Sequence, residues 1–287
     1  MNSNLFASSR LLLSMAGLFT VAVSAKADEA WMNLTAPLLE QLTMPDVEQA
    51  RPGGCSGVVV NRITGEITVK VVGHGLWRSG DQGKTWHRVD QETASGRDET
   101  GWATNVDQNA PDRIASFSLD GSAGWTPDGK TFTDLGRNWD HGSVDWSAIN
   151  PLTIIAAKHE TNPPGEVYAT KDGGVTWKQL PIHLKESRGQ ISMIGALGEA
   201  TFIYSTGEGI YRSNDFGKSW NQISLANPQK RIPIFFNGAY YLGTSTGLLV
   251  SQDQGATWQK QGSEVSIWQG PFFGRDERSM LVVGEEH

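Results

Sequence analysis

The sequence predicts an all-β fold made of repeated antiparallel units, and three observations carry this prediction. The first is composition, since 33 Gly and 11 Trp in 287 residues, with few helical patterns, suit many short strands joined by tight turns. The second is a phrase of the form S/T-x-D-x-G-x-T/S-W/F that occurs five times. The third is the spacing of its aspartates, 47, 44, 43 and 38 residues, which is typical of stacked or radial β-units.

Each copy of the phrase lies between two β-like runs and predicts a hairpin turn. In such a turn the Asp accepts backbone hydrogen bonds and the Gly adopts a positive φ. The aromatic residue begins the next strand and fills the space between neighbouring sheets. The copies are SGDQGKTW at 79–86, TPDGKTF at 126–132 with one residue fewer, TKDGGVTW at 170–177, SNDFGKSW at 213–220 and SQDQGATW at 251–258. We therefore assign a structural role to Asp81, Gly83, Trp86, Asp128, Phe132, Asp172, Gly174, Trp177, Asp215, Gly217, Trp220, Asp253, Gly255 and Trp258.

These phrases resemble the Asp-box, or bacterial neuraminidase repeat, of sialidase-like β-propellers. That group includes sialidases, xyloglucan-cleaving hydrolases, sortilin-type receptor ectodomains and a photosystem II assembly factor. The resemblance implies a β-propeller of four-stranded antiparallel blades, with each box between the third and fourth strands on the face away from the ligand site. It does not imply one function, because the same motif occurs in enzymes, receptors and assembly factors.

The chain begins with features of a secretory signal peptide at 1–27: Arg10, an apolar run from Leu11 to Val23, and a cleavage site at Ala25-Lys26-Ala27. We expect a mature chain that starts at Asp28 and is exported to the periplasm or secreted. Residues 28–55 form an N-terminal arm in which Leu34 to Gln49 predicts a short helix or irregular structure. Trp31 to Leu34 could add a closing strand.

From residue 56 to 287 the sequence divides into units of four β-runs. We predict five complete blades and a partial sixth, which opens with IWQGPFFGRDE and SMLVVGEEH. Because a propeller closes on itself to protect its strand edges, we expect a piece of a six- or seven-bladed protein. The alternative is a native open propeller.

Composition excludes several partners and groups. The mature chain would hold 22 basic and 31 acidic residues, a net charge of −9, which disfavours nucleic acid. No run of apolar residues reaches the ~20 that a membrane helix needs. The single cysteine, Cys55, allows no internal disulfide, and the six His lack metal-ligand spacing. We expect no metal, no cofactor and a monomer.

The loops that enter each first strand, and those that join second to third strands, carry the candidate site. For binding a sugar or a peptide they offer arginines, aromatics and histidines: Arg97, Trp102, Arg137, Trp139, His141, His159, Arg188, Arg231 and Trp268. The carboxylates that could serve in catalysis are Asp98, Asp140, Asp145 and Glu160. The predicted entry loop 136–147 holds five of these thirteen residues, so we place the centre of the site there.

Two functions fit these residues. The first is a binding or assembly module for a protein or glycan, and the second is a sialidase-like or xyloglucanase-like glycoside hydrolase with a carboxylate pair. Sialidases share an Arg-Ile-Pro element near the start of the propeller, but here Arg231-Ile232-Pro233 follows the fourth box. The tyrosines 168, 204, 211, 240 and 241 fall within second or third strands, so no nucleophile can be assigned. The sequence favours the binding module.

Overall fold

We analysed a computed structural model that describes residues 32–43, 54–98, 102–158, 166–182, 191–207, 209–228 and 232–285. The chain divides into two units, 1–33 and 34–287. The described residues of the first unit, Met32 and Asn33, lie outside helices and strands, and the predicted signal peptide and Trp31 lie outside the described residues. The helix and all the strands belong to the second unit.

The second unit contains five four-stranded antiparallel sheets and one two-stranded sheet, and each four-stranded sheet follows chain order from its first to its last strand. The first sheet consists of β1 (Cys55–Val60), β2 (Ile67–Val71), β3 (Gly75–Ser79) and β4 (His87–Arg88). The second consists of β5 (Thr104–Val106), β6 (Ile114–Ser116), β7 (Ser122–Thr126) and β8 (Thr133–Arg137). The third consists of β9 (Trp139–Val144), β10 (Ile154–Lys158), β11 (Val167–Thr170) and β12 (Lys178–Gln179).

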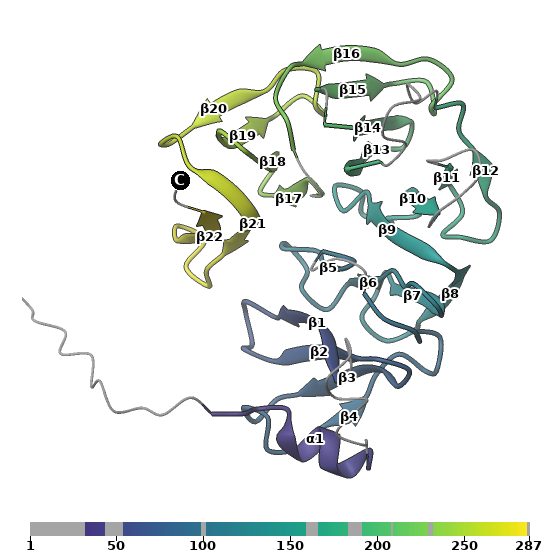
Figure 1. Cartoon of the computed structure of the whole chain (residues 1–287), viewed down its shortest axis with the longest axis vertical. Coiled ribbons are helices and arrows are strands. Elements are labelled where there is room, and N and C mark those ends of the chain that lie inside the picture. Colours follow the sequence, from purple (N-terminus) through teal and green to yellow (C-terminus); the bar gives the residue numbers. More distant parts are fainter. Residues whose placement is uncertain are drawn as a thin grey trace, which may run out of the picture. The chain divides into compact units, whose positions relative to one another are not determined.

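The remaining sheets repeat the pattern. The fourth consists of β13 (Met193–Gly198), β14 (Thr201–Ser205), β15 (Ile210–Ser213) and β16 (Asn221–Ser224). The fifth consists of β17 (Ile234–Phe236), β18 (Ala239–Thr244), β19 (Gly247–Ser251) and β20 (Gln259–Gln261). The sixth pairs β21 (Ser266–Phe273) with β22 (Met280–Glu285). Figure 1 shows the sheets following one another around a centre, with their first strands innermost. The prediction of five complete blades and a partial sixth is confirmed.

The hydrophobic core lies between neighbouring sheets rather than within one layer. Between the second and third sheets, Trp125, Leu135 and Trp139 are almost fully buried together. The rings of Trp139 and Trp177, the aromatic residue of the third box, lie 4.7 Å apart. Each sheet thus buries its apolar side chains against its neighbours, as expected for blades packed face to face.

Each box forms the turn between the third and fourth strands of its sheet. In the first box, Ser79 Oγ donates to Asp81 Oδ1 at 2.8 Å, and Thr85 donates through its backbone N at 2.9 Å and its Oγ1 at 2.7 Å. The third, fourth and fifth boxes repeat these bonds. In the second box, Asp128 accepts from Thr126 Oγ1 and from two backbone N–H groups.

These bonds stabilise the ionised carboxylate, because every donor favours the charged form. The backbone N–H of Thr85, followed by the Thr85 and Ser79 hydroxyls, lowers the pKa of Asp81 to about 2. At Asp172 the main donors are the hydroxyls of Thr170 and Thr176, and the pKa is again lowered to about 2. The second box differs, since its Asp128 pKa is lowered mainly by the backbone N–H groups of Thr131 and Lys130. The box aspartates are therefore acceptors committed to their own turns.

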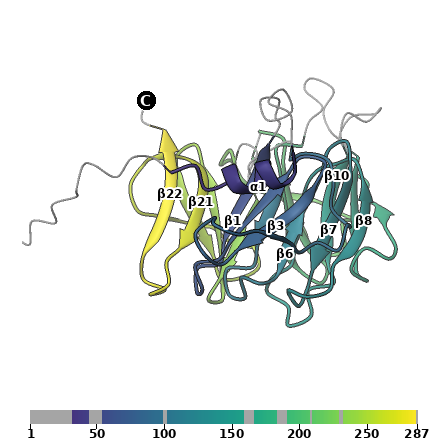
Figure 2. The same cartoon turned by 90° about the horizontal axis from the view of Figure 1, so that it is seen from below.

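A short helix, α1 (Ala36–Gln41), covers part of the first sheet. Pro37 stands in its first turn, where a missing backbone N–H costs nothing. Leu38 is fully buried against Val69, Val71 and Trp86. Figure 2 shows α1 lying across the strands of this sheet. Within the described residues, no helix is long and apolar enough to cross a membrane.

One predicted loop is wrong in the structure. The segment 136–147, expected to be an entry loop, is mostly β9, the first strand of the third sheet. Its small residues suit this crowded position: a Cβ on Gly142 would lie 2.1 Å from Phe117 Cε1, and Ser143 Oγ accepts from the backbone N of Ala196 at 3.2 Å. Polarity and small size here reflect close packing between sheets, not exposure.

Candidate functional site

A cavity of about 550 Å³ lies among the first strands of four sheets, the first, second, fifth and sixth. Its size is within the range of ligand sites. Most of its wall is apolar, and the described lining residues are Val58, Val59, Val60, Arg62, Trp102, Thr104, Asn105, Val106, Gln108, Ile232, Ile234, Trp268, Gln269, Gly270, Phe272, Phe273, Gly274, Arg275 and Leu281.

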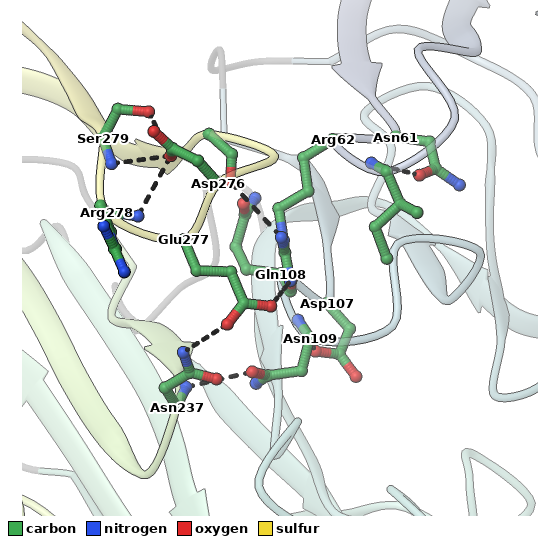
Figure 3. Close-up of polar contacts among 12 residues, drawn as sticks. Asn61, Arg62, Asp107, Gln108, Asn109, Asn237, Asp276, Glu277, Arg278 and Ser279 are labelled. Carbon is green, nitrogen blue, oxygen red and sulfur yellow. Dashed lines mark hydrogen bonds and ion pairs between the residues drawn. The ribbon is translucent and has the colours of Figure 1, made fainter.

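At one end of the cavity, the turns that follow the four first strands bond to one another (Figure 3). Arg62, whose side chain is 8% exposed, is the centre of this group. Its Nε donates to the Gln108 carbonyl at 2.6 Å and its Nη2 to Glu277 at 3.3 Å, while its guanidinium stacks 4.9 Å from the centre of the Phe236 ring. Arg62 thereby joins turns of the first, second, fifth and sixth sheets.

Asn237 and Asn61 add two further joins at the same end. The backbone N of Asn237 donates to Asn109 Oδ1 at 3.0 Å, and its Nδ2 lies 3.4 Å from Glu277 Oε2. Asn61 Nδ2 donates to Asp112 Oδ1 at 3.0 Å. We call the turns 61–66, 107–113, 237–238 and 274–279 the turn cluster. It forms a polar end wall beside a cavity whose remaining wall is mostly apolar.

Two predicted binding residues, Trp102 and Trp268, line the cavity at the entry side of β5 and near the start of β21. Trp102 is half-buried, whereas 51% of Trp268 is exposed. An exposed indole at the edge of an apolar cavity is a common anchor for ligands. These two are the predicted site residues that the cavity brings together.

Asp98, a predicted catalytic residue, does not line the cavity; it is buried in an ion pair and bonds to Thr104, which does. Its Oδ1 lies 3.0 Å from Lys70 Nζ, and neither side chain is exposed to solvent. Thr104 Oγ1 donates to Oδ2 at 2.7 Å, and Lys70 also donates to the Phe117 carbonyl and to Ser118 Oγ. Burial raises the pKa of Asp98 and lowers that of Lys70, while their mutual attraction opposes both shifts. The arrangement joins the first and second sheets.

Asp145, a second catalytic candidate, lies after the end of β9 and is also buried. It accepts hydrogen bonds from the backbone N of Ser147 at 3.1 Å, from Ser147 Oγ at 2.5 Å and from Tyr240 OH at 3.2 Å. Burial, with the nearby Asp145 charge, raises the pKa of Tyr240. The bond connects the third and fifth sheets.

The other predicted residues of the segment 136–147 do not line the cavity. Trp139 is buried between sheets and carries Lys158 Nζ 3.6 Å above its ring. His141 is buried, Asp140 half-buried and Arg137 exposed. In the loop before β5, Arg97 pairs with Asp120 at 3.3 Å. The remaining predictions, His159, Glu160, Arg188 and Arg231, lie outside the described residues.

Sequence reasoning missed the polar residues of the cavity, Arg62, Asn105, Gln108, Gln269 and Arg275. Arg62, Gln108 and Arg275 lie in turns that follow first strands, while we searched the loops that precede them. The sequence did contain a signal for these residues, because the turns that follow first strands differ from one unit to the next, whereas the boxes repeat. Among the described residues, no three His, Cys, Asp or Glu side chains form a group that could hold a metal ion.

Comparisons with known proteins agree with this architecture. The family model of the BNR-Asp box repeat matches residues 210–223. A search of curated protein sequences gives no significant match. Solved structures that resemble the chain include an ancestral GH74 enzyme (17% identity, 73% of this chain and 31% of that chain, TM-score 0.44). The GH74 xyloglucanase from Xanthomonas campestris has 14% identity over 73% of this chain and 39% of that chain, with a TM-score of 0.44.

A third resemblance is to YCF48 from Cyanidioschyzon merolae, at 16% identity over 76% of each chain with a TM-score of 0.45. The chain spans 31% and 39% of the lengths of the two GH74 chains. These likenesses carry no argument about activity. The five box turns, the successive four-stranded sheets and the matching repeat model together define the architecture. The chain is a β-propeller built from BNR-Asp box repeats.

Proposed function

We propose that this chain is an exported binding module that takes a protein or peptide ligand into the central cavity. One observation carries the proposal: the cavity has a largely apolar wall and, among its described lining residues, no aspartate or glutamate. An apolar wall with a few polar groups suits the side chains and amides of a peptide. A sugar would leave many hydroxyls without partners against such a wall.

The hydrolase alternative finds less support. Glycoside hydrolysis needs two carboxyl groups across one cleft, about 5–5.5 Å or about 6.5–9.5 Å apart. Of the predicted carboxylates that the structure describes, Asp98 is committed to Lys70 and Asp145 to Tyr240 and Ser147. Asp140 is half-buried and does not line the cavity. These contacts favour a structural role for the two buried carboxylates, Asp98 and Asp145.

The binding test compares two exposed valines. Val58→Trp would fill the cavity, which Val58 lines, whereas Val175→Trp adds the same bulk in the third box turn. The full-length mature chain and both variants are used to select random heptapeptides displayed on phage, and are probed on a glycan array. We expect enriched peptides with the wild type and Val175→Trp, and none with Val58→Trp. Enrichment that survives Val58→Trp, or binding of glycans alone, would overturn the proposal.

Catalysis is tested on the same preparation with fluorogenic glycosides, including a sialoside, and with xyloglucan. We expect no turnover. Turnover that Asp140→Asn or Asp145→Asn abolishes would establish the hydrolase instead.

Export is tested separately, because the predicted signal peptide lies outside the described residues. The full chain is expressed in a bacterium, and the protein from the periplasm and the medium is analysed by intact mass. We expect a product that begins at Asp28. A product that keeps residues 1–27 and stays in the cytoplasm would contradict export.

A further inference from the structure

The charged residues of the cavity are all of one sign. Of the described residues that line it, only Arg62 and Arg275 carry a formal charge. This is unusual in a chain of net charge −7. Because Arg62 is paired with Glu277, the positive charge left for a ligand at this end of the cavity is that of Arg275. A single cation beside an apolar wall favours a ligand whose apolar part continues into an anionic group.

Arg275 has an unused charge. It is exposed at the turn after β21 and forms no hydrogen bond or ion pair with any residue that the structure describes. Its neighbours in the turn are occupied: Asp276 accepts from the backbone N of Arg278 and from Ser279, and Glu277 pairs with Arg62. The guanidinium of Arg275 is therefore available to an incoming carboxylate.

Arg62 is held more firmly but retains capacity. Three of its N–H groups serve the Gln108 carbonyl, the Gly274 carbonyl and Glu277. A guanidinium has five N–H donors in a fixed geometry, so two remain. Because Arg62 is fixed by the turn cluster, it would meet a ligand without losing further side-chain freedom.

A buried polar side chain in the wall, Asn105, indicates which groups the rest of the ligand carries. Asn105 is 6% exposed, and its Nδ2 lies 3.4 Å from the carbonyls of Trp102 and Gly142, but its Oδ1 has no donor within the described structure. An unpaired buried acceptor is costly, and because Asn105 lines the cavity, a rotation of its amide toward a ligand N–H would remove that cost. Peptide backbones carry regularly spaced N–H groups, whereas an acyl chain has none.

From these three observations we infer that the cavity recognises a peptide segment in which apolar side chains are followed by an acidic residue. The apolar side chains fill the cavity, a backbone N–H faces the Asn105 side, and the acidic side chain meets Arg275. This inference rests on the proposed function and adds the chemistry of its ligand.

The test uses two arginines of one turn. Arg275 lines the cavity, while Arg278, equally exposed and three residues later, does not. The heptapeptide selection is repeated with Arg275→Glu and Arg278→Glu. The best wild-type peptide is then synthesised with Glu, Gln or Lys at its acidic position, with a blocked C-terminus, and its Kd is measured by fluorescence anisotropy.

With the wild type and Arg278→Glu we expect Asp or Glu next to apolar residues, and weakening of up to about fivefold for Gln, the upper end of the range for one exposed ion pair. With Arg275→Glu the Lys peptide should bind best. If binding is lost in Val58→Trp but the three peptides keep one order in both arginine variants, the inference is wrong and the proposed function stands. If Val58→Trp does not affect binding, the proposed function itself fails.

Discussion

The box turns and the turn cluster are both built from short loops, yet they bond in opposite ways. A box satisfies itself: Ser79, Asp81 and Thr85 bond within eight residues of chain, and other boxes repeat the pattern. The turn cluster bonds outward, as Arg62 does with Gln108 and with Glu277, 215 residues away. The bonds that the boxes repeat therefore lie within single blades, whereas the bonds of the turn cluster hold blades together and shape one end of the cavity. Four substitutions test this contrast.

The largest effect should come from the buried pair near the centre. Lys70→Met leaves the Asp98 carboxylate buried and unpaired, which costs about 3–5 kcal/mol. Denaturant unfolding measures the loss. The control is Lys171→Met in the third box, where the partner Glu199 is 85% exposed and the pair at 3.7 Å is worth less than about 1 kcal/mol. Equal losses from the two substitutions would contradict the contrast.

The second-largest loss of stability should come from a substitution in a box turn, because a box glycine can also contact the preceding blade. Gly255 has φ 75°, and a Cβ there would lie 2.6 Å from Leu197 Cδ1. Gly262 has φ 78° with open space around it, so Gly262→Ala isolates the strain of the backbone. We expect about 1 kcal/mol for Gly262→Ala and about 3 kcal/mol for Gly255→Ala, which adds overpacking. Similar unfolding midpoints for the two variants would show that the contact is unimportant.

Arg62→Met should cost about 2 kcal/mol, since it removes a part-buried hydrogen bond to a carbonyl and an exposed one to a carboxylate. Its control is Arg278→Met, which removes an exposed guanidinium from the sixth sheet. Limited proteolysis should cut the sixth sheet of Arg62→Met faster than that of the control. A wild-type cleavage rate would mean that the turn cluster does not depend on Arg62.

The smallest effect is on the stability of the fold at low pH. The pKa of Asp172 is lowered to about 2, below its ordinary value of about 3.9. A lowered folded-state pKa contributes stability at pH above about 4, and this contribution is lost as the pH falls toward 2. Asp172→Asn should therefore lower Tm at pH 6 and flatten its fall between pH 4 and 2. Asp128→Asn, in the box with fewer hydroxyl donors, should do so less; the reverse order would contradict the role of the hydroxyls.

The sequence was sufficient for the parts of the fold that are local. Each box is a contiguous phrase whose hydrogen bonds close within a few residues, so five blades could be predicted. The strand β9 could not, because Gly142 and Ser143 are small to fit Phe117 and Ala196, residues of other sheets. Of the residues that line the cavity, only Trp102 and Trp268 were predicted from the sequence. Arg62 acts through contacts that join distant turns, which no local pattern encodes.

The Arg62 to Glu277 join also has a consequence for how the chain folds. A hairpin within one blade closes a loop of about ten residues, whereas this join closes one of 215, at an extra entropic cost of about 3 kcal/mol. Blades can form in the order in which they are synthesised, but the join between Arg62 and Glu277 waits until the sixth sheet has been made. We expect this join, and the end of the cavity beside it, to form after the blades that it connects.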